Sequence, residues 1–478
     1  MIDIEKLNFK AGLEIHQQLD TNKLFCKCPS ILRNDEPSFV IKRRLHAAVG
    51  ETGEFDEAVL HEAAKDRQFI YQGYDSICLV ELDESPPYEI NEEALKIAIQ
   101  ISLLLHCRIV PVTQIMRKIV IDGSNTSGFQ RTVLIAMDGY VETSFGKVGI
   151  SSVALEEDAA RIIESNDKEC VYRLDRLGIP LVEISTYPDM KNPMQVKEVA
   201  LHIGEVLRSC KVKRGIGTIR QDVNLSIAGH ERVEIKGFQE PKMFIKTIEI
   251  EINRQIENIK KNKTCGEVRR AKDDGTTEFM RPMPGAARMY PETDLPLLFI
   301  PKSLIDEAKN TLPRLKKEIR NDLKDRGLDL ELVNLVLSED RFEEVKDIAQ
   351  NYRDINLIAK MLVLWPKEFS KKEGVALSEV YKRMSVDAAE SIIDAINSGR
   401  ISKEDVQDII FRFLNGENLL NLLNEERVSE KEVEKEVVRL LNEKPGLSIN
   451  AYMGLVMNKF KGRISGKIVM EIIKKYIA

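Results

Sequence analysis

Residues 1–300 contain short runs in which apolar and polar positions alternate with a period of two. The clearest runs cover residues 7–19, 115–121, 133–145, 182–184, 221–227 and 233–235. Each run predicts a β-strand with one buried face. Helical periodicity interrupts these runs at residues 92–105, 193–209 and 243–261. Since most of the runs are separated by turns, we expect a largely antiparallel domain of the α+β class.

From residue 301 onward, apolar positions recur with helical spacing and charged residues occupy the opposite faces. Prolines crowd residues 282–301 and mark an extended connector before this helical part. A helix stop lies at residues 366–374. We therefore expect a sheet domain over residues 1–300, a helical domain over 301–372 and an all-α tail domain over 373–478.

The composition is that of a globular protein, because 43% of the 478 residues are hydrophobic and 31% are charged. No apolar run reaches the roughly 18 residues that a membrane span requires, and the N-terminus lacks an apolar leader. We expect a cytoplasmic protein with no membrane contact. The net charge of −6 argues against a wholly basic surface, yet residues 451–478 carry six Lys and Arg against one acid. That block could contact phosphates, or could equally be a solvated helix end.

The seven cysteines are scattered, as expected for reduced thiols in a reducing compartment. Cys26 and Cys28 form the only close pair. A zinc site usually has a second pair at a fixed spacing, and none is present, so the sequence disfavours zinc.

Several of the predicted strands carry acids on their polar faces. In the run at 7–19, Leu13 and Ile15 share one face, whereas Glu14 and His16 lie on the other, roughly 7 Å apart at about 3.3 Å per residue. Acids with similar settings are Glu156, Glu157, Glu183, Asp222 and Glu234. A solvated face explains any one strand alone. If these acids converged, however, they would repel one another unless a cation lay between them. Carboxylates together with one imidazole are suitable ligands for a magnesium ion that also binds substrate phosphates.

The usual phosphate-binding loops are absent, since neither a P-loop nor a complete dinucleotide-binding glycine motif occurs. Residues 122–132 instead form a loop rich in hydroxyl and amide side chains. This loop could present donors to an anion, although a long hairpin turn is the commoner explanation.

The longest motifs are similar to those of a known family. Residues 12–19, 155–159, 175–184, 220–226 and 233–237 resemble signature segments of the B and E subunits of tRNA-dependent amidotransferases, the GatB/GatE family. Residues 122–132 and 279–294 resemble the archaeal E branch more than the B branch. Members of that branch carry an inserted domain like part of bacterial aspartyl-tRNA synthetase, for which residues 252–269 leave no room.

This resemblance implies a catalytic cradle domain, a helical domain and a YqeY-like tail that binds tRNA. It implies a carbon–nitrogen ligase that converts Glu-tRNA(Gln) to Gln-tRNA(Gln), with ATP as co-substrate and Mg²⁺ as cofactor. Ammonia would come from an asparaginase-like D subunit (GatD), in a heterotetramer of two D and two E subunits. The alternative is a non-catalytic tRNA-binding scaffold in such a complex.

The resemblance also implies roles for single residues. The proposed metal ligands are His16, Glu157 and Glu183. The proposed catalytic residues are Glu14, His16, Glu156, Asp222 and Lys236. Contacts with ATP or substrate are expected from Ser127, Gln130 and Arg220. Contacts with tRNA are expected from Lys459, Lys461, Arg463 and Lys467.

Overall fold

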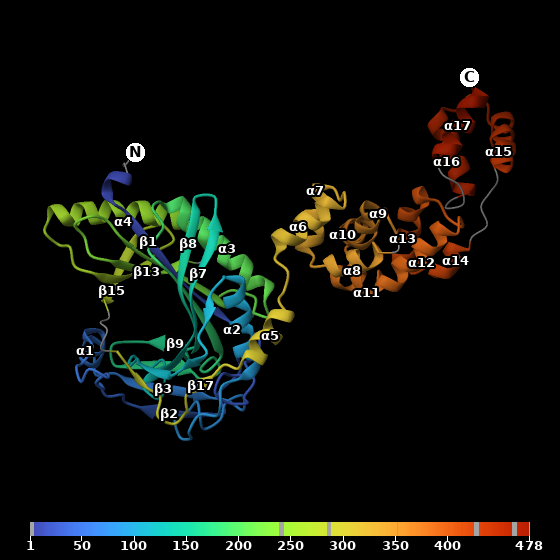
Figure 1. Ribbon diagram of the computed structural model, residues 1–478. Coiled ribbons are helices and arrows are strands. Elements are labelled where there is room, and N and C mark those ends of the chain that lie inside the picture. The colour runs from blue at the N-terminus through green and yellow to red at the C-terminus, as the bar shows by residue number, and fades with distance from the viewer. Residues whose placement is uncertain are drawn as a thin grey trace. The chain divides into compact units, whose positions relative to one another are not determined.

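The computed structural model describes residues 4–238, 243–283, 288–350, 352–424, 430–460 and 466–477. The chain divides into two compact units, Met1–Leu315 and Lys316–Ala478 (Figure 1). The boundary lies later than residue 300, because α5 (Lys302–Asn310) belongs to the first unit. Leu304 and Ala308 of this helix are buried in the core of that unit, where they pack with residues of the main sheet.

An 11-stranded sheet forms the centre of the first unit. Its strands, in spatial order, are β15 (Thr277–Pro282), β14 (Glu267–Ala271), β13 (Val233–Phe238), β12 (Ile219–Ser226), β1 (Lys10–Gln18), β11 (Pro180–Thr186), β8 (Gly146–Glu157), β7 (Phe129–Thr143), β6 (Ile115–Ile119) and β16 (Met289–Pro291), with β4 (Arg108–Ile109) beside β7. Every pairing except β13 with β14 is antiparallel. The predicted α+β class is confirmed.

Helices pack on the apolar face of this sheet. They are α2 (Glu92–Leu104), α3 (Pro193–Ser209), α4 (Met243–Lys260) and α5 (Figure 1). The N-termini of α2 and α3 are capped by Asn91 and Asn192, whose side-chain oxygens accept backbone N–H groups of the first turn. These four helices lie on the apolar face, so they leave the polar side chains of the strands available on the other.

A four-stranded sheet, β2 (Phe39–Arg43), β3 (Gln68–Gly73), β10 (Glu169–Arg173) and β9 (Arg161–Ser165), lies in the same unit. It has a small core of its own, comprising Phe69, Tyr71, Ala160, Cys170, Tyr172, Leu174 and Leu177. The remaining elements of the unit are η1 (Glu5–Leu7), α1 (Glu57–Ala63), β5 (Val112–Thr113) and β17 (Leu298–Phe299).

The second unit is helical in its described residues. Its elements are α6 (Lys316–Asp325), α7 (Leu330–Ser338), α8 (Phe342–Ile348), α9 (Ile355–Ala359), η2 (Lys360–Leu364), α10 (Trp365–Glu373), α11 (Leu377–Arg383), α12 (Val386–Asn397), η3 (Lys403–Asp405), α13 (Val406–Leu414), α14 (Leu419–Leu423), α15 (Glu430–Glu443), α16 (Ile449–Lys459) and α17 (Gly466–Ile477).

Two apolar cores form within this unit. One runs from Leu323 to Leu423 and the other from Val433 to Ile473. The first core continues past residue 372, because α10 and α11 contribute Phe369 and Val380 to the same cluster. The separate tail core therefore begins near residue 433 instead of 373. Among the described residues, no helix is both long enough and apolar enough to span a membrane.

Candidate active site

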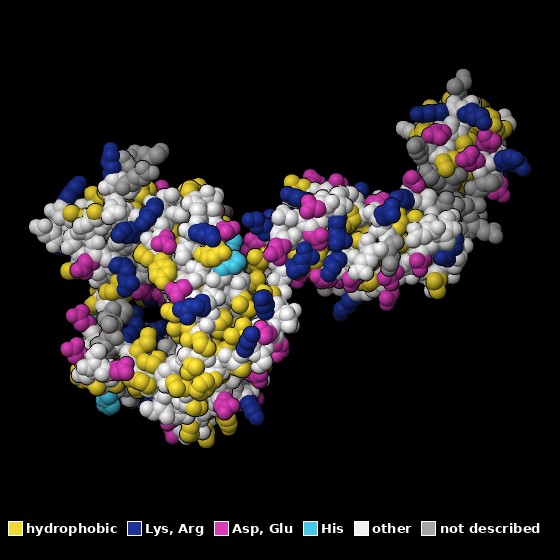
Figure 2. Space-filling model, viewed as in Figure 1, with side chains coloured by type: hydrophobic (Ala, Val, Ile, Leu, Met, Phe, Trp, Pro, Cys, Tyr) yellow, Lys and Arg dark blue, Asp and Glu magenta, His cyan; other side chains and the backbone are white. Residues whose placement is uncertain are grey.

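The polar face of β1 opens onto a cavity of about 740 Å³. Glu14 and His16 line this cavity, whereas Ile15 between them is fully buried in the core. In the ladders on either side, His16 lies opposite Glu183 of β11 and Arg220 of β12. Since opposite residues of antiparallel strands share a face, these side chains converge in the cavity. Figure 2 shows a hollow on one face of the first unit with charged side chains around it.

One imidazole and two carboxylates form the centre of the site. His16 Nε2 lies 3.3 Å from Glu183 Oε2 and 3.5 Å from Glu14 Oε1. One ligand atom from each of these three residues lies within 4.8 Å of the other two. Glu183 Oε2 is buried, and no group in the described chain makes a hydrogen bond to it. This donor set and its unsatisfied oxygen fit a hard divalent cation that keeps some of its waters.

The pKa values show how strongly these groups interact. Burial, followed by repulsion from Glu183, raises the pKa of Glu14 to about 7. Burial also opposes ionisation of Glu183, but the nearby Lys118 ammonium and His16 hold its pKa below the usual value. Burial of the His16 ring opposes its protonation, but the adjacent Glu183 carboxylate outweighs this effect and raises the pKa of His16. The site therefore already attracts positive charge.

Glu156 lies beside this centre and is held by two donors. Lys118 Nζ is 2.8 Å from Glu156 Oε1, and it is also 3.6 Å from Glu183 Oε2. Gln130 Nε2 donates to Glu156 Oε2 at 3.0 Å and to the Glu157 carbonyl oxygen at 2.7 Å. Gln130 therefore positions Glu156 in this arrangement.

A second charged group lies where β12 meets β13. Lys236 Nζ is 2.7 Å from Asp222 Oδ2 and forms another ion pair with Glu234. A bulge interrupts the ladder here, and Gly237 has a φ of +92°, which favours glycine. The Gly237 N–H donates to Asp222 Oδ1 at 3.3 Å. The bulge thus brings Lys236 and Asp222 together at the cavity wall.

Arginines form another part of the cavity lining. Four of these arginines have no carboxylate within ion-pair distance in the part of the chain that the structure describes. They are Arg232, Arg270, Arg281 and Arg288. Burial lowers the pKa of Arg288, whose Nε donates to the Ile119 carbonyl oxygen. Arg220, by contrast, pairs with Asp158 at 2.8 Å. Guanidinium groups free of acids are suited to binding phosphate oxygens.

Two of the residues expected at the site lie elsewhere. Glu157 is adjacent to Glu156 on β8, so its side chain points to the other face of the sheet. There its Oε2 lies 3.3 Å from Arg131 Nη1 within a buried ion pair, and it is not grouped with His16 and Glu183. Ser127 Oγ donates to the Phe129 carbonyl oxygen inside the loop and does not line the cavity. Glu14, expected as a catalytic residue, is the acid that lies with His16 and Glu183 in this structure.

The other residues expected at the site line the cavity, together with seven charged residues that sequence reasoning did not assign to it. These are Lys118, Asp158, Arg232, Glu234, Arg270, Arg281 and Arg288. Glu234 and Lys118 occupy polar positions of recognised alternating runs, which could have identified them. Arg281 precedes the proline-rich connector and Arg288 lies within it, where no periodicity exists to place a side chain.

The residues expected to contact tRNA lie in the tail. Lys459, at the end of α16, is half exposed, and its Nζ lies 2.5 Å from Glu436 Oε2. Lys461 and Arg463 lie outside the described residues, and only the backbone of Lys467, in α17, is described. The tRNA-binding role of these four residues stays a prediction.

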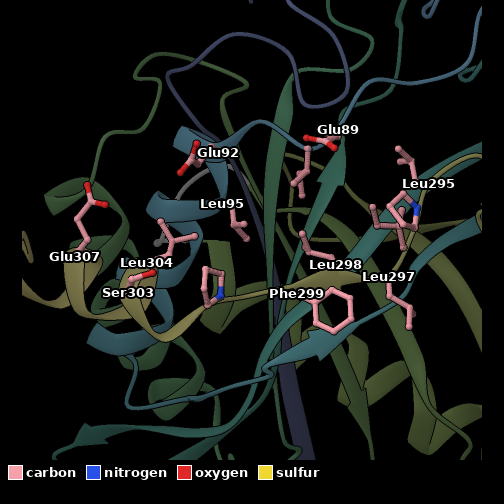
Figure 3. Close-up of a pocket in the computed structure, with 14 residues that line it drawn as sticks. Glu89, Glu92, Leu95, Leu295, Leu297, Leu298, Phe299, Ser303, Leu304 and Glu307 are labelled. Atoms are coloured by element: carbon pink, nitrogen blue, oxygen red, sulfur yellow. The ribbon is translucent and has the colours of Figure 1, made fainter.

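A second cavity in the first unit, of about 410 Å³, has a different character. Leu295, Leu297, Leu298 and Phe299 contribute much of its lining, and the acids Glu89, Glu92 and Glu307 also take part (Figure 3). The lining residues include no Lys, Arg or His. It therefore lacks the cations that phosphate binding requires.

Comparison with known proteins agrees with this division of the molecule. Residues 9–306 match the family model described as the GatB/GatE catalytic domain. The chain therefore belongs to the GatB/GatE family of tRNA-dependent amidotransferases, which are carbon–nitrogen ligases of protein biosynthesis. The resemblance seen in the sequence is confirmed.

Relatives along the whole chain are named as archaeal E subunits of glutamyl-tRNA(Gln) amidotransferase. That of Methanocaldococcus jannaschii is 36% identical over 628 aligned residues, covering 99% of both chains. Those of Thermococcus gammatolerans and Archaeoglobus fulgidus are 34% and 33% identical, again over 99% of both chains. The alignment of 628 positions exceeds the 478 residues of this chain by 150, so the relative from Methanocaldococcus contains extra internal sequence.

Proposed function

We propose that this chain activates and amidates the glutamyl group of Glu-tRNA(Gln) in an ATP-dependent reaction. The observation that carries the proposal is the convergence of Glu14, His16 and Glu183 in one cavity that unpaired arginines also line. The names of its archaeal relatives support the choice of substrate.

The first step makes the γ-carboxylate reactive. A carboxylate oxygen of the glutamyl group attacks the γ-phosphorus of ATP, the bond between the β- and γ-phosphates breaks, and ADP leaves. Glu14, His16 and Glu183 would hold Mg²⁺, which supplies neutralisation of the negative charge on the phosphate oxygens. Arg281 and Arg288, which have no acid partner among the described residues, would orient the phosphates.

The second step exchanges phosphate for nitrogen. Ammonia attacks the γ-carbonyl carbon of the acyl phosphate, phosphate leaves, and the nitrogen loses a proton. Glu156 and Asp222, both facing the cavity, are the carboxylates available to guide ammonia or accept that proton. Lys236 lies 2.7 Å from Asp222 and would contact the departing phosphate.

Ammonia is mostly protonated near neutral pH, so the reaction requires a source close to the cavity. We propose an asparaginase-like D subunit as that source, in a complex of two D and two E subunits. The tail would hold the tRNA through Lys459, Lys461, Arg463 and Lys467.

The test is ATP hydrolysis stimulated by Glu-tRNA(Gln), together with amidation, in the reconstituted complex. We expect His16→Ala to abolish both and to leave tRNA affinity unchanged, because His16 lies in the sheet cavity and the proposed tRNA contacts lie in the tail. The matched control is His61→Ala, since His61 is exposed on α1. Unchanged hydrolysis in His16→Ala would favour the scaffold alternative, and joint loss of hydrolysis and tRNA binding would contradict the metal role.

A further inference from the structure

Asp158 directly follows β8 and is a buried acid in the lining of the active-site cavity. Its Oδ2 accepts a hydrogen bond from Gln18 Nε2 at 2.6 Å, and its Oδ1 accepts one from Arg220 Nη2 at 2.8 Å. The Asp158 N–H donates to the Ile179 carbonyl oxygen at 2.8 Å. A buried carboxylate with a donor on each oxygen is held in one orientation, so it can position the groups that bond to it.

Two further features fix the Asp158 carboxylate relative to the sheet. Gln18 ends β1 two residues after His16, and it is buried. Since β1 is paired with a strand on both sides, the Gln18 amide has a fixed starting point. Arg176 adds a second positive charge, because its Nε lies 3.8 Å from Asp158 Oδ1 and donates to the Ala159 carbonyl oxygen at 2.8 Å.

Arg220 is the member of this cluster that reaches into the cavity. Its side chain is 36% exposed, whereas that of Asp158 is 1% exposed. Nη2 is the one guanidinium nitrogen of Arg220 that donates to the described part of the chain. The remaining N–H groups can donate two hydrogen bonds to a carboxylate. Because Arg220 lies opposite His16 in the ladder, a carboxylate bound there would lie beside the proposed metal ligands.

The charge balance of this cluster favours a carboxylate over the phosphates of ATP. Asp158 offsets part of the charge of Arg220, whereas Arg281 and Arg288 have no acid partner among the described residues. Unpaired guanidinium groups suit a polyphosphate, which carries several charges. A guanidinium that is fixed and partly neutralised suits a ligand with one charge and a defined plane.

We propose that Arg220 binds the γ-carboxylate of the glutamyl group, and that Asp158, itself held by Gln18, is the positioning residue that aims Arg220 at it. This inference rests on the proposed function, since it takes Glu-tRNA(Gln) as the substrate. The γ-amide of the product has no negative charge, and its nitrogen cannot accept a hydrogen bond. Arg220 therefore holds the substrate more tightly than the product.

The first experiment compares the affinities of the full chain for Glu-tRNA(Gln) and Gln-tRNA(Gln) without ATP. We expect the wild type to bind Glu-tRNA(Gln) about tenfold more tightly, and Arg220→Gln and Asp158→Asn to lose most of this preference. The control is Asp138→Asn, which should keep it, because Asp138 pairs with Arg108 at an exposed position. A wild type without the preference, or Arg220→Gln with all of it, would overturn the proposal.

The outcome of this binding test is separate from that of the proposed function, because no catalysis is measured. A wild-type complex that fails to amidate Glu-tRNA(Gln), in a chain that keeps the binding preference, contradicts the proposed reaction and supports the role of Arg220. An active complex whose chain shows no preference contradicts the role of Arg220 alone.

The second experiment tests whether Asp158 acts through Arg220. An amide at position 158 must face either Gln18 or Arg220 with a donor against a donor, so Asp158→Asn should weaken Glu-tRNA(Gln) binding about fivefold. The double variant should bind within about twofold of Arg220→Gln alone, and losses that multiply would show independent roles and overturn the positioning role. If Asp158→Asn fails to fold, Gln18→Met, which removes the donor to Asp158, replaces it in the same cycle with the same criterion.

The third experiment separates the glutamyl group from ATP as the ligand of Arg220. In the reconstituted complex, Arg220→Gln should raise the KM for Glu-tRNA(Gln) about tenfold and leave the KM for ATP within about twofold of wild type. A KM for ATP that rises as much as the KM for Glu-tRNA(Gln) would overturn the proposal, because it would indicate a phosphate contact.

Discussion

Glu292 follows β16 in the proline-rich connector. Its buried carboxylate links this connector to the main sheet through ion pairs with Arg117 of β6 and Arg131 of β7. Its Oε2 accepts a hydrogen bond from Arg131 Nε at 2.8 Å, and its Oε1 accepts one from Arg117. The Asp294 N–H donates to the same Oε1 at 2.8 Å. The side chain of Glu292 is completely buried. Replacement by Gln keeps the shape and removes the charge that compensates two guanidinium groups.

The cost of Glu292→Gln can be estimated from these contacts. Removing one partner of a buried ion pair usually costs about 3–5 kcal/mol. Arg131 keeps its pair with Glu157 at 3.3 Å, and Arg117 keeps Asp294 at 3.2 Å. With those remaining partners we expect the first unit to lose about 2–3 kcal/mol of its free energy of unfolding.

The same contacts predict how this loss depends on pH. Burial opposes ionisation of Glu292, but Arg117, the Asp294 N–H and Arg131 together lower its pKa below 4.5. A carboxyl group whose pKa is lowered by folding stabilises the fold above its unfolded pKa and loses that effect as pH falls through the folded pKa. The difference between wild type and Glu292→Gln should be constant above about pH 5.5 and should shrink below pH 4.5.

The assay is urea unfolding at several pH values, followed by far-ultraviolet circular dichroism and by tryptophan fluorescence. The chain has one tryptophan, Trp365, which is buried in the second unit and provides an internal control. We expect only the transition of the first unit to shift. A loss below about 1 kcal/mol, or a difference that persists unchanged to pH 3.5, would refute the reasoning.

Three further predictions concern the reaction and tRNA. Glu156→Gln should lower amidation about a hundredfold, whereas Glu157→Gln should stay within about threefold of wild type, measured as Gln-tRNA formed; equal effects would contradict the assignment of the two faces. Arg281→Gln should raise the KM for ATP about tenfold, with a smaller effect on kcat; an unchanged KM would exclude a phosphate contact. Alanine at the four tail residues should weaken tRNA binding and reduce its salt slope by about 0.7–0.9 for each cation that no longer meets a phosphate; unchanged affinity would reject that assignment. The residues replaced are Lys459, Lys461, Arg463 and Lys467.

Much of the sheet could be predicted from alternation, because a period of two determines which side chains share a face. For β1 this placed Glu14 and His16 together and opposite the buried Ile15. Alternation alone could not supply the partners of His16, since Glu183 and Arg220 reach it only through the strand order and register; only the family resemblance suggested them. Those depend on the packing of the whole sheet.

The structure departs from the sequence-based expectations where periodicity gives no information. The family motif contains Glu156 and Glu157 side by side, and only the pleat of β8 decides which of them faces the cavity. Ser127 lies in a loop where the hydroxyl bonds its own backbone. The helix α5 follows the prolines, yet it packs on the first unit, because burial of Leu304 and Ala308 outweighs its position in the sequence.

The position of each charged group in the sheet suggests that central and edge residues have different roles in the reaction. β1, β11 and β8 are interior strands, paired on both sides, so Glu14, His16 and Glu183 are held by a continuous hydrogen-bonded ladder. Arg270 and Arg281 lie on β14 and β15, at one end of the sheet. Groups on the rigid centre can be aligned for charge that develops in the transition state, whereas edge strands can adapt to a bound phosphate chain. Substitutions at the centre should therefore act mainly on kcat, and substitutions at the edge mainly on KM.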